Sequence, residues 1–188
     1  MRRGALADYF GRVKSLFERL PEAEIKSALE LLHQTSAAGN RIFVAGNGGS
    51  AALASHFATD LSVGTLRRTG KIIRAVSLAD NQSILTATAN DVSFEEVYVE
   101  QLRVQAQSND VVVLISSSGK SPNIIRAAKY CRENKLNVVA LIGFDGGDLR
   151  TLVSHPVFVN SPIGDYGPIE DVHAMICHMF AEYLREFV

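Results

Sequence analysis

Residues 41–60 read Arg-Ile-Phe-Val-Ala-Gly-Asn-Gly-Gly-Ser-Ala-Ala-Leu-Ala-Ser-His-Phe-Ala-Thr-Asp, and the fold of the chain follows from this stretch. The apolar run at 41–45 has the length and composition of a strand, and the alanine-rich part after the glycines is typical of a helix. Where a glycine turn joins a strand to a helix, the backbone approaches a ligand closely and the free N–H groups of the first helical turn favour an anion, usually phosphate. We therefore expect an anion site at residues 46–50.

His56 and Asp60 lie in the predicted helix and are four residues apart. That spacing places both side chains on one face, one turn apart, where they are candidates for chemistry next to the anion. Such a pair is also common as a plain surface contact. Two other interpretations of the stretch stay open: the glycines form only a tight turn, or the Gly-x-Gly-x-x-Ala pattern at residues 46–51 binds a dinucleotide, with Asp80 as the ribose-binding acid.

The composition bounds the class of protein. The 188 residues suit one domain, and hydrophobic residues make up 47%, charged residues 21%, with a formal net charge of −1. This balance argues against a nucleic-acid-binding surface and against a disordered chain. Cys131 and Cys177 form no Cys-x-x-Cys pattern, which predicts reduced thiols. Charged residues interrupt the apolar N-terminus and no apolar run is long enough for a membrane span, so we expect a soluble, cytoplasmic protein.

The hydrophobic pattern predicts a doubly wound α/β fold. Apolar residues recur at helical spacing through residues 3–20 and again up to about residue 38, which predicts two helices before the first strand. Further apolar runs alternate with helical segments and read as strands, at residues 72–78, 111–117, 137–143 and 156–160. Near-continuous apolar strands indicate a parallel sheet covered on both faces. We predict a single domain over residues 1–188, a three-layer α-β-α sandwich with a five-stranded parallel sheet, in which 1–38 form a helical hairpin for oligomerisation and 39–188 form the core.

A second glycine-containing loop, Ser116-Ser-Ser-Gly-Lys-Ser121, follows the third predicted strand. Its Gly-Lys-Ser ending mimics a nucleotide P-loop, but that motif needs a glycine where this chain has Leu114. What remains is four hydroxyls, a glycine turn and a helix N-terminus, which together make a neutral phosphate cradle. Alternatively, Ser118 or Ser121 is an ordinary helix cap. Parallel sheets bind ligands at the carboxyl ends of their strands, so the loops after the first and third strands are expected to share a site.

Three further segments carry polar residues of interest. Asn90 and Asp91 end a short helical run, although both residue types are common in turns. Glu170 and His178 fall on one stripe of a helix predicted over residues 168–188, where a buried carboxylate or imidazole needs a partner. Residues 62–70 read as a polar loop long enough to cover a site.

Taken together, these motifs resemble the sugar isomerase (SIS) domain family and, within it, the phosphoheptose isomerases. The resemblance covers essentially the whole chain and rests on an ordered set of motifs: Gly46-Asn-Gly-Gly-Ser50, His56 with Asp60, Ala89-Asn-Asp91, Ser116-Ser-Ser-Gly-Lys-Ser121, Gly143-Phe-Asp-Gly-Gly147 and Glu170-Asp-Val-His-Ala-Met-Ile-Cys-His178. It implies an isomerase that converts sedoheptulose 7-phosphate to D-glycero-D-manno-heptose 7-phosphate, a homotetramer with its site between subunits, and a bound zinc ion.

The resemblance also implies a role for individual residues. The sugar phosphate is expected to contact Asn47, Gly48, Gly49, Ser50, Asn90, Asp91, Ser116, Ser117, Ser118 and Ser121. Zinc is expected at His56, Asp60, Glu170 and His178, and proton transfer at Asp60, Glu170 and His178. The chain departs from the usual family pattern at Asp60, where a glutamate base is common, and at Glu170, where a glutamine is common. Because the shorter acid reaches less far, we expect Glu170 to transfer the proton and Asp60 to bind the metal.

The expected chemistry explains why such residues are needed. Isomerisation through an enediol requires a base at carbon, an acid or base at oxygen, and stabilisation of the enediolate. Two other functions stay open. One is a non-catalytic SIS protein, a phosphosugar-binding regulator or a partner of the replication initiator, although such proteins tend to lack the C-terminal histidine that is present here as His178. The other is a dinucleotide-dependent oxidoreductase, which leaves the serine loop without a role.

Overall fold

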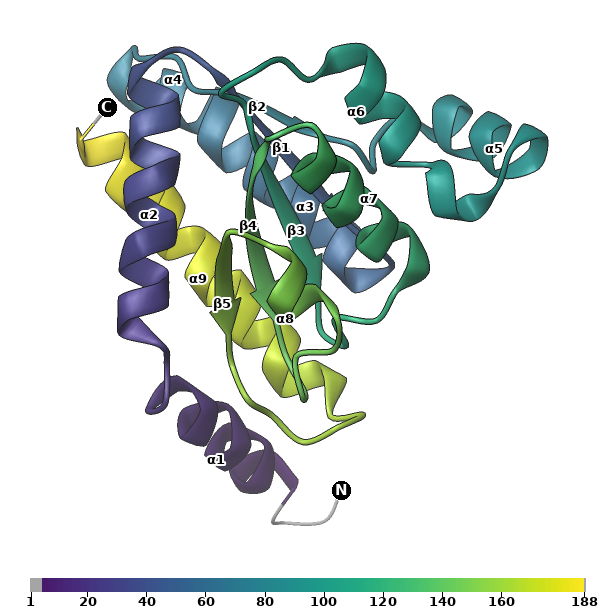
Figure 1. The fold of residues 1–188 in the computed structure, drawn as a ribbon. Helices are drawn as coiled ribbons and strands as arrows, with labels where there is room; N and C mark the ends of the chain where they lie inside the picture. The colour runs from purple at the N-terminus through teal and green to yellow at the C-terminus, as the bar shows by residue number, and fades with distance from the viewer. Residues whose placement is uncertain (1–4, 188) are drawn as a thin grey trace.

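The computed structural model describes residues 5–187, and a five-stranded sheet forms its centre (Figure 1). The strands are β1 (Arg41–Gly46), β2 (Arg74–Ser77), β3 (Val111–Ser116), β4 (Asn137–Ile142) and β5 (His155–Phe158). They lie in the order β2-β1-β3-β4-β5, and each neighbouring pair is parallel. The predicted five-stranded parallel sheet is therefore confirmed, with strand ends that differ from the predicted ones by one or two residues.

Helices bury both faces of this sheet. One face packs against α2 (Glu22–Ala37), α3 (Gly49–Thr59) and α9 (Tyr166–Phe187). The other packs against α6 (Val99–Gln105), α7 (Pro122–Glu133) and α8 (Leu149–Leu152). Successive strand residues point to opposite faces, so Ile42 and Val44 enter the first core and Phe43 and Ala45 the second. Burial on both faces is the reason why the strands are apolar without alternation.

The two N-terminal helices form as predicted, but each packs on a different part of the chain. Helix α2 buries Ile25, Ala28 and Leu32 in the core beside the sheet. Helix α1 (Ala5–Phe17) turns away from α2 and packs against α9 (Figure 1). Leu16 is its only fully buried side chain among those described, whereas Phe10 and Phe17 remain exposed. The hairpin is therefore an open one, and α2 belongs to the core.

The segment predicted as a polar loop at residues 62–70 is helical, which corrects that expectation. A turn of π-helix (Asp60–Gly64) continues α3 and leads into α4 (Thr65–Thr69). The hydroxyls that made the segment look like a loop bond back to the helix backbone. Ser62 Oγ donates to the Ala58 carbonyl at 2.6 Å, and Thr65 Oγ1 donates to the Asp60 carbonyl at 3.3 Å. Ser and Thr side chains that donate to carbonyls of their own helix are compatible with helical structure, so their polarity does not indicate a loop.

The strand order places the two glycine-containing loops side by side. In a sheet of order 2-1-3-4-5, the crossover connections from β1 and β3 leave in opposite directions, and the gap between them receives the ligand. Helix α5 (Gln82–Asp91) follows β2 and protrudes from the core (Figure 1), whereas the 3₁₀ turn Phe94–Glu96 packs against α7. Within residues 5–187, none of the helices has both the length and the apolar character needed to cross a membrane.

Candidate active site

A polar cavity of about 130 Å³ opens between the loops that follow β1 and β3. Its lining comes from both loops and from the start of α9: Asn47, Ser50, Ile115, Ser116, Ser117, Ser118, Ser121, Tyr166 and Glu170. Its position at the carboxyl ends of the strands is the one expected from the topology. A cavity of this volume suits a phosphate group, and it is smaller than the pockets of several hundred Å³ that hold larger cofactors.

The serine loop, residues 116–121, lines this cavity with its four serines. Ser116 Oγ accepts a hydrogen bond from the Gly119 N–H at 3.1 Å, and Ser118 Oγ accepts one from the Lys120 N–H at 3.2 Å. Ser121 occupies the cap position of α7 without capping it through its side chain. Ser117 Oγ is buried and has no partner in the part of the chain that the structure describes. A buried hydroxyl that lacks a partner and lines a cavity points to a ligand.

Buried hydrogen bonds fix the loop after β1. The side-chain amides of Asn47 and Asn123 each donate to the other at 2.8 Å, which ties this loop to the first turn of α7. The Tyr98 hydroxyl donates to the Gly46 carbonyl and, at 3.3 Å, to Asn47 Oδ1. Burial raises the pKa of Tyr98 to about 12, so the hydroxyl stays a donor at neutral pH. The cavity is therefore built before any ligand arrives.

Gly49 lies directly against the carboxylate of Glu170. A Cβ atom at Gly49 would lie 2.9 Å from Glu170 Oε2, closer than such contacts normally come. Glu170 lies on α9 between the cavity of the serine loop and a second cavity of about 160 Å³, which His173 also lines. Its carboxylate is thus next to the glycine turn and lines both cavities.

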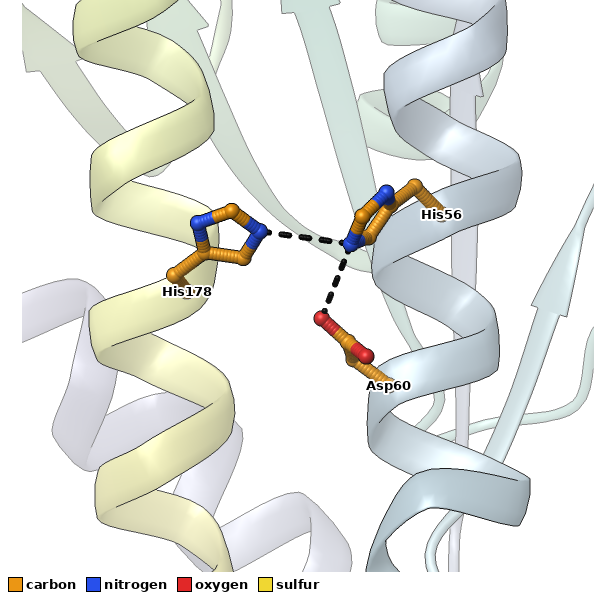
Figure 2. Close-up of side chains that lie close together, drawn as sticks. All are labelled: His56, Asp60 and His178. Atoms are coloured by element: carbon orange, nitrogen blue, oxygen red, sulfur yellow. Dashed lines mark hydrogen bonds and ion pairs between the residues drawn. The ribbon is translucent and has the colours of Figure 1, made fainter.

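A second group of side chains, the histidine cluster, joins α3 to α9 (Figure 2). It consists of His56, Asp60 and His178. His56 Nε2 lies 3.2 Å from Asp60 Oδ2 and 3.2 Å from His178 Nε2. Asp60 is the first residue of the π-helical turn, and its carboxylate is 27% exposed, so water and small ligands reach the cluster.

The donor set of the histidine cluster is compatible with a metal ion. One potential ligand atom from each residue lies within 4.8 Å of the other two. Two imidazole nitrogens face one another with a carboxylate beside them, so one cation can contact all three groups. Two nitrogens and one oxygen are ligands that Zn²⁺ accepts, and three protein ligands leave a position free for substrate.

The structure separates other residues that the sequence analysis had grouped together. Glu170 is not part of the histidine cluster: it precedes His178 by eight residues on α9, which is about 12 Å at 1.5 Å per residue. Asn90 and Asp91 are exposed at the end of α5, where Asn90 Nδ2 donates to Asp91 Oδ1 at 2.7 Å, and they line neither of the two cavities around Glu170. Within one subunit they are apart from the serine loop.

Three residues at the site were missed by sequence reasoning. Asn123 and Tyr98 hold the loop after β1, and Tyr166 lines the cavity and packs edge-on against Phe144 with ring centroids 5.0 Å apart. Asn123 carried a signal, because it is polar in the first turn of a helix that is otherwise buried there. Tyr98 and Tyr166 act through contacts with distant segments, and the sequence carried no signal for either residue.

Comparison with known proteins identifies the class. A sequence profile of the SIS domain matches residues 8–143, and the chain belongs to this family. Among proteins of known name, it is 39% identical over 161 residues to the phosphoheptose isomerase of Geobacter sp. (strain M21), covering 86% of this chain and 82% of the relative. It is 35% identical over 181 residues to that of Bordetella avium (strain 197N), covering 94% and 91%.

A solved structure agrees with the sequence comparisons. The phosphoheptose isomerase from Neisseria gonorrhoeae superposes with a TM-score of 0.85 at 33% identity, covering 97% of this chain and 96% of the other. The similarity therefore extends over the N-terminal helices and α9 as well as the sheet. It includes every element that contributes to the cavity and to the histidine cluster.

Proposed function

We propose that this protein is a phosphosugar aldose–ketose isomerase that converts sedoheptulose 7-phosphate to D-glycero-D-manno-heptose 7-phosphate through an enediol. The observation that carries the proposal is the pairing of two sites in one subunit. A cavity of phosphate size with the unpartnered hydroxyl of Ser117 lies at the end of the sheet, and the imidazoles and carboxylate of the histidine cluster lie beyond it, where α3 meets α9. Relatives over nearly the full chain length are phosphoheptose isomerases.

In this proposal the serine loop binds the phosphate through Ser116, Ser117, Ser118 and Ser121. The turn after β1 contacts the adjoining part of the sugar through Asn47, Gly48, Gly49 and Ser50. Neutral hydroxyl and N–H donors hold the dianion without a counter-charge, as helix N-termini commonly do. Asn90 and Asp91 protrude on α5, so we propose that they contact sugar hydroxyls in the site of a neighbouring subunit.

Proton transfer is assigned to the groups nearest the sugar. Glu170 lies against Gly49 beside the cavity, which supports it as the base at carbon. His178 projects from the same helix; it would hold the metal in the zinc-loaded protein, and in the metal-free protein its imidazole can exchange the proton at oxygen. Asp60 contacts His56 rather than the cavity of the serine loop, which supports a role as ligand over a role as base. This arrangement agrees with the expectation for the shorter acid at that position.

The proposed metal is one Zn²⁺ per subunit, held by His56, Asp60 and His178. When bound, it would polarise the sugar carbonyl and stabilise the enediolate. Glu170, which the family resemblance also places among the ligands, serves in this proposal on the sugar side. Equilibrium dialysis with Zn²⁺ tests the ligand set, because alanine at any of the three positions should weaken binding whereas Glu170→Gln should not.

The competing dinucleotide hypothesis needs Asp80 as the acid that binds the ribose, and the position of Asp80 does not support that role. The Asp80 carboxylate accepts a hydrogen bond from Ser55 and lines a different cavity, between α3 and β2. The non-catalytic SIS hypothesis leaves the contact between His56 and His178 without a use. The decisive experiment incubates the zinc-loaded protein with sedoheptulose 7-phosphate and other ketose phosphates and follows the aldose by NMR. Binding of ATP or NAD at micromolar concentration, with no binding of sugar phosphates, would contradict the proposal.

We further propose a homotetramer. An apolar groove of about 510 Å³ lies between the N-terminal helices and α9, and Phe17, Met179 and Tyr183 are exposed along it. Removing residues 1–38 would remove α2 and uncover the part of the core that α2 covers, which would unfold the chain, so a point substitution is the better test. Phe17→Glu should dissociate the assembly in light scattering at micromolar concentration, and a wild-type monomer would refute it.

A further inference from the structure

The turn at residues 143–147, Gly-Phe-Asp-Gly-Gly, has no role in the function proposed above. It follows β4 and packs against the serine loop; we call it the support turn. A Cβ atom at Gly147 would lie 2.5 Å from the Gly119 carbonyl oxygen, and one at Gly119 would overlap the Gly146 carbonyl. Both glycines have positive φ, +51° at Gly147 and +62° at Gly119. The two backbones therefore touch where only glycine fits.

Lys120 and Asp145 hold the two segments together from the outside. Lys120 Nζ lies 2.7 Å from Asp145 Oδ2, and Asp145 Oδ1 accepts the Gly147 N–H at 3.2 Å. The Lys120 stem crosses Gly147 so closely that a Cβ there would lie 2.7 Å from Lys120 Cγ. The hydrogen bond from Lys120 lowers the pKa of Asp145, which keeps the pair charged. From the other side, the Leu149 N–H donates to the Gly119 carbonyl at 3.1 Å.

The support turn touches the serine loop at Gly119, and Gly119 is the residue that positions the serine hydroxyls of the proposed phosphate site. The Gly119 N–H donates to Ser116 Oγ, and the next N–H, of Lys120, donates to Ser118 Oγ. A displacement of Gly119 is therefore passed on to two hydroxyls that line the cavity. Such groups must be placed to within about 0.5 Å to act together.

We propose that Gly147 and the Lys120–Asp145 pair are positioning residues for the substrate phosphate, acting through Gly119. Lys120 in this assignment supports the loop and does not bind the phosphate itself. The inference rests on the proposed phosphate role of the serine loop. A purely structural role would lower the melting temperature without changing phosphate affinity, so affinity and stability must be measured together.

The main test is Gly147→Ala, with Gly39→Ala as the matched control. Gly39 has φ +74° and no atom within 4 Å of a built Cβ, so alanine there introduces left-handed strain without a collision. The dissociation constant of inorganic phosphate is measured by calorimetry, and KM and kcat with sedoheptulose 7-phosphate. For Gly147→Ala we expect the dissociation constant and KM to rise at least ~10-fold, with a smaller change in kcat, since misplacement by about 1 Å can cost up to ~100-fold. Gly39→Ala should leave all three within about twofold. Equal changes in both variants, or a lower melting temperature with unchanged phosphate affinity, would overturn the proposal.

Asp145→Asn and Lys120→Met test the pair should Gly147→Ala fail to fold. An exposed ion pair contributes little, so each should weaken phosphate binding by about threefold and the double variant by no more than either alone. Tighter binding in Asp145→Asn, or a loss above ~30-fold in Lys120→Met, would mean that Lys120 contacts the phosphate directly and would overturn the assignment. Phosphate binding is measured without turnover, so a wild-type protein that binds phosphate but isomerises no sugar refutes the proposed function and leaves this inference standing.

Discussion

The serine loop and the histidine cluster differ in how the chain assembles them. The serine loop is six consecutive residues, 116–121, between a buried strand and a helix. The histidine cluster joins His56 and Asp60 on α3 to His178 on α9, across 122 residues of sequence. The first is largely set by local backbone geometry. The second exists only because two helices pack on the same face of the sheet.

The difference predicts separate consequences for mutation. If the serine loop binds the phosphate as proposed, a change in it should act on phosphate affinity, because the phosphate does not react. If the histidine cluster holds the metal near the reacting carbons as proposed, a change in it should act on turnover and on metal binding.

The largest effect is expected for His178→Ala. The imidazole reaches the cluster from α9 and is the member that the proposed non-catalytic relatives lack, so kcat should fall by ~10³-fold, within the range of a lost acid–base group. Because the side chain is exposed, the melting temperature should change little. Steady-state kinetics and thermal unfolding measure both. Activity within tenfold of wild type would remove His178 from the mechanism.

His173 lies on the same helix and tests whether α9 contributes more than catalytic groups. Burial lowers its pKa from 6.5 to about 4, although the Ile142 carbonyl acts in the opposite direction. Between these values the unfolded chain binds the proton and the folded chain does not. Stability is therefore lost as the pH falls from about 6.5 to about 4, by about 3 kcal/mol. His173→Leu should flatten this part of the curve of unfolding free energy against pH in urea titrations, and an unchanged slope would contradict the assignment.

Much of the fold could be predicted because it follows from local pattern. Continuous apolar runs predicted all five strands of a parallel sheet, and the strand-glycine-helix order at residues 41–60 predicted the loop that now lines a cavity at the end of the sheet. The serine loop was found for the same reason. The segment at 62–70 failed because Ser62 and Thr65 bond to carbonyls within their own helix, and composition does not record where a hydroxyl points.

The site was predicted less completely because spacing along a helix defines a stripe and not a point. Glu170 and His178 share a stripe of α9, yet their backbone positions are about 12 Å apart along the helix, and their side chains contact different groups. Tyr98 acts on Gly46 across the sheet, a contact that no sequence pattern indicates. Roles that the family resemblance implies for Asn90 and Asp91 remain predictions, since one subunit leaves them apart from the cavity.

Asp60→Glu tests whether the acid at position 60 binds metal or transfers a proton. If Asp60 is a ligand, the added methylene displaces the metal, and kcat and zinc affinity should both fall, kcat by ~100-fold. Asp60→Asn should lose both, because it removes an anionic ligand. Glu170→Gln is the matched control and should lose activity while it retains zinc. Activity that is kept or raised in Asp60→Glu would instead identify Asp60 as the base. Zinc affinity is measured by competition with a chromophoric chelator.

The smallest effect, and the sharpest one for the serine loop, is expected for Ser117→Ala. The Ser117 hydroxyl is buried, 5% exposed for the residue as a whole, and has no partner in the described chain. In the free protein it therefore carries a desolvation cost that alanine removes, so the unfolding free energy should stay the same or rise by about 1 kcal/mol. With substrate bound, the same hydroxyl gains a phosphate oxygen. Its loss should raise KM by ~10-fold. This factor corresponds to about 1.4 kcal/mol, close to the contribution of one hydrogen bond to a charged group.

Opposite signs for stability and affinity distinguish a ligand-binding hydroxyl from a structural one. Ser55→Ala is the matched control, since Ser55 Oγ is already bonded to the Ala51 carbonyl at 3.1 Å and to Asp80. That variant should lose stability and keep its KM. If Ser117→Ala is destabilised with unchanged KM, as Ser55→Ala should be, then the hydroxyl has an internal role and the cavity of the serine loop does not bind the phosphate at that position. If kcat falls instead of KM rising, the division between a binding loop and a reacting cluster is wrong.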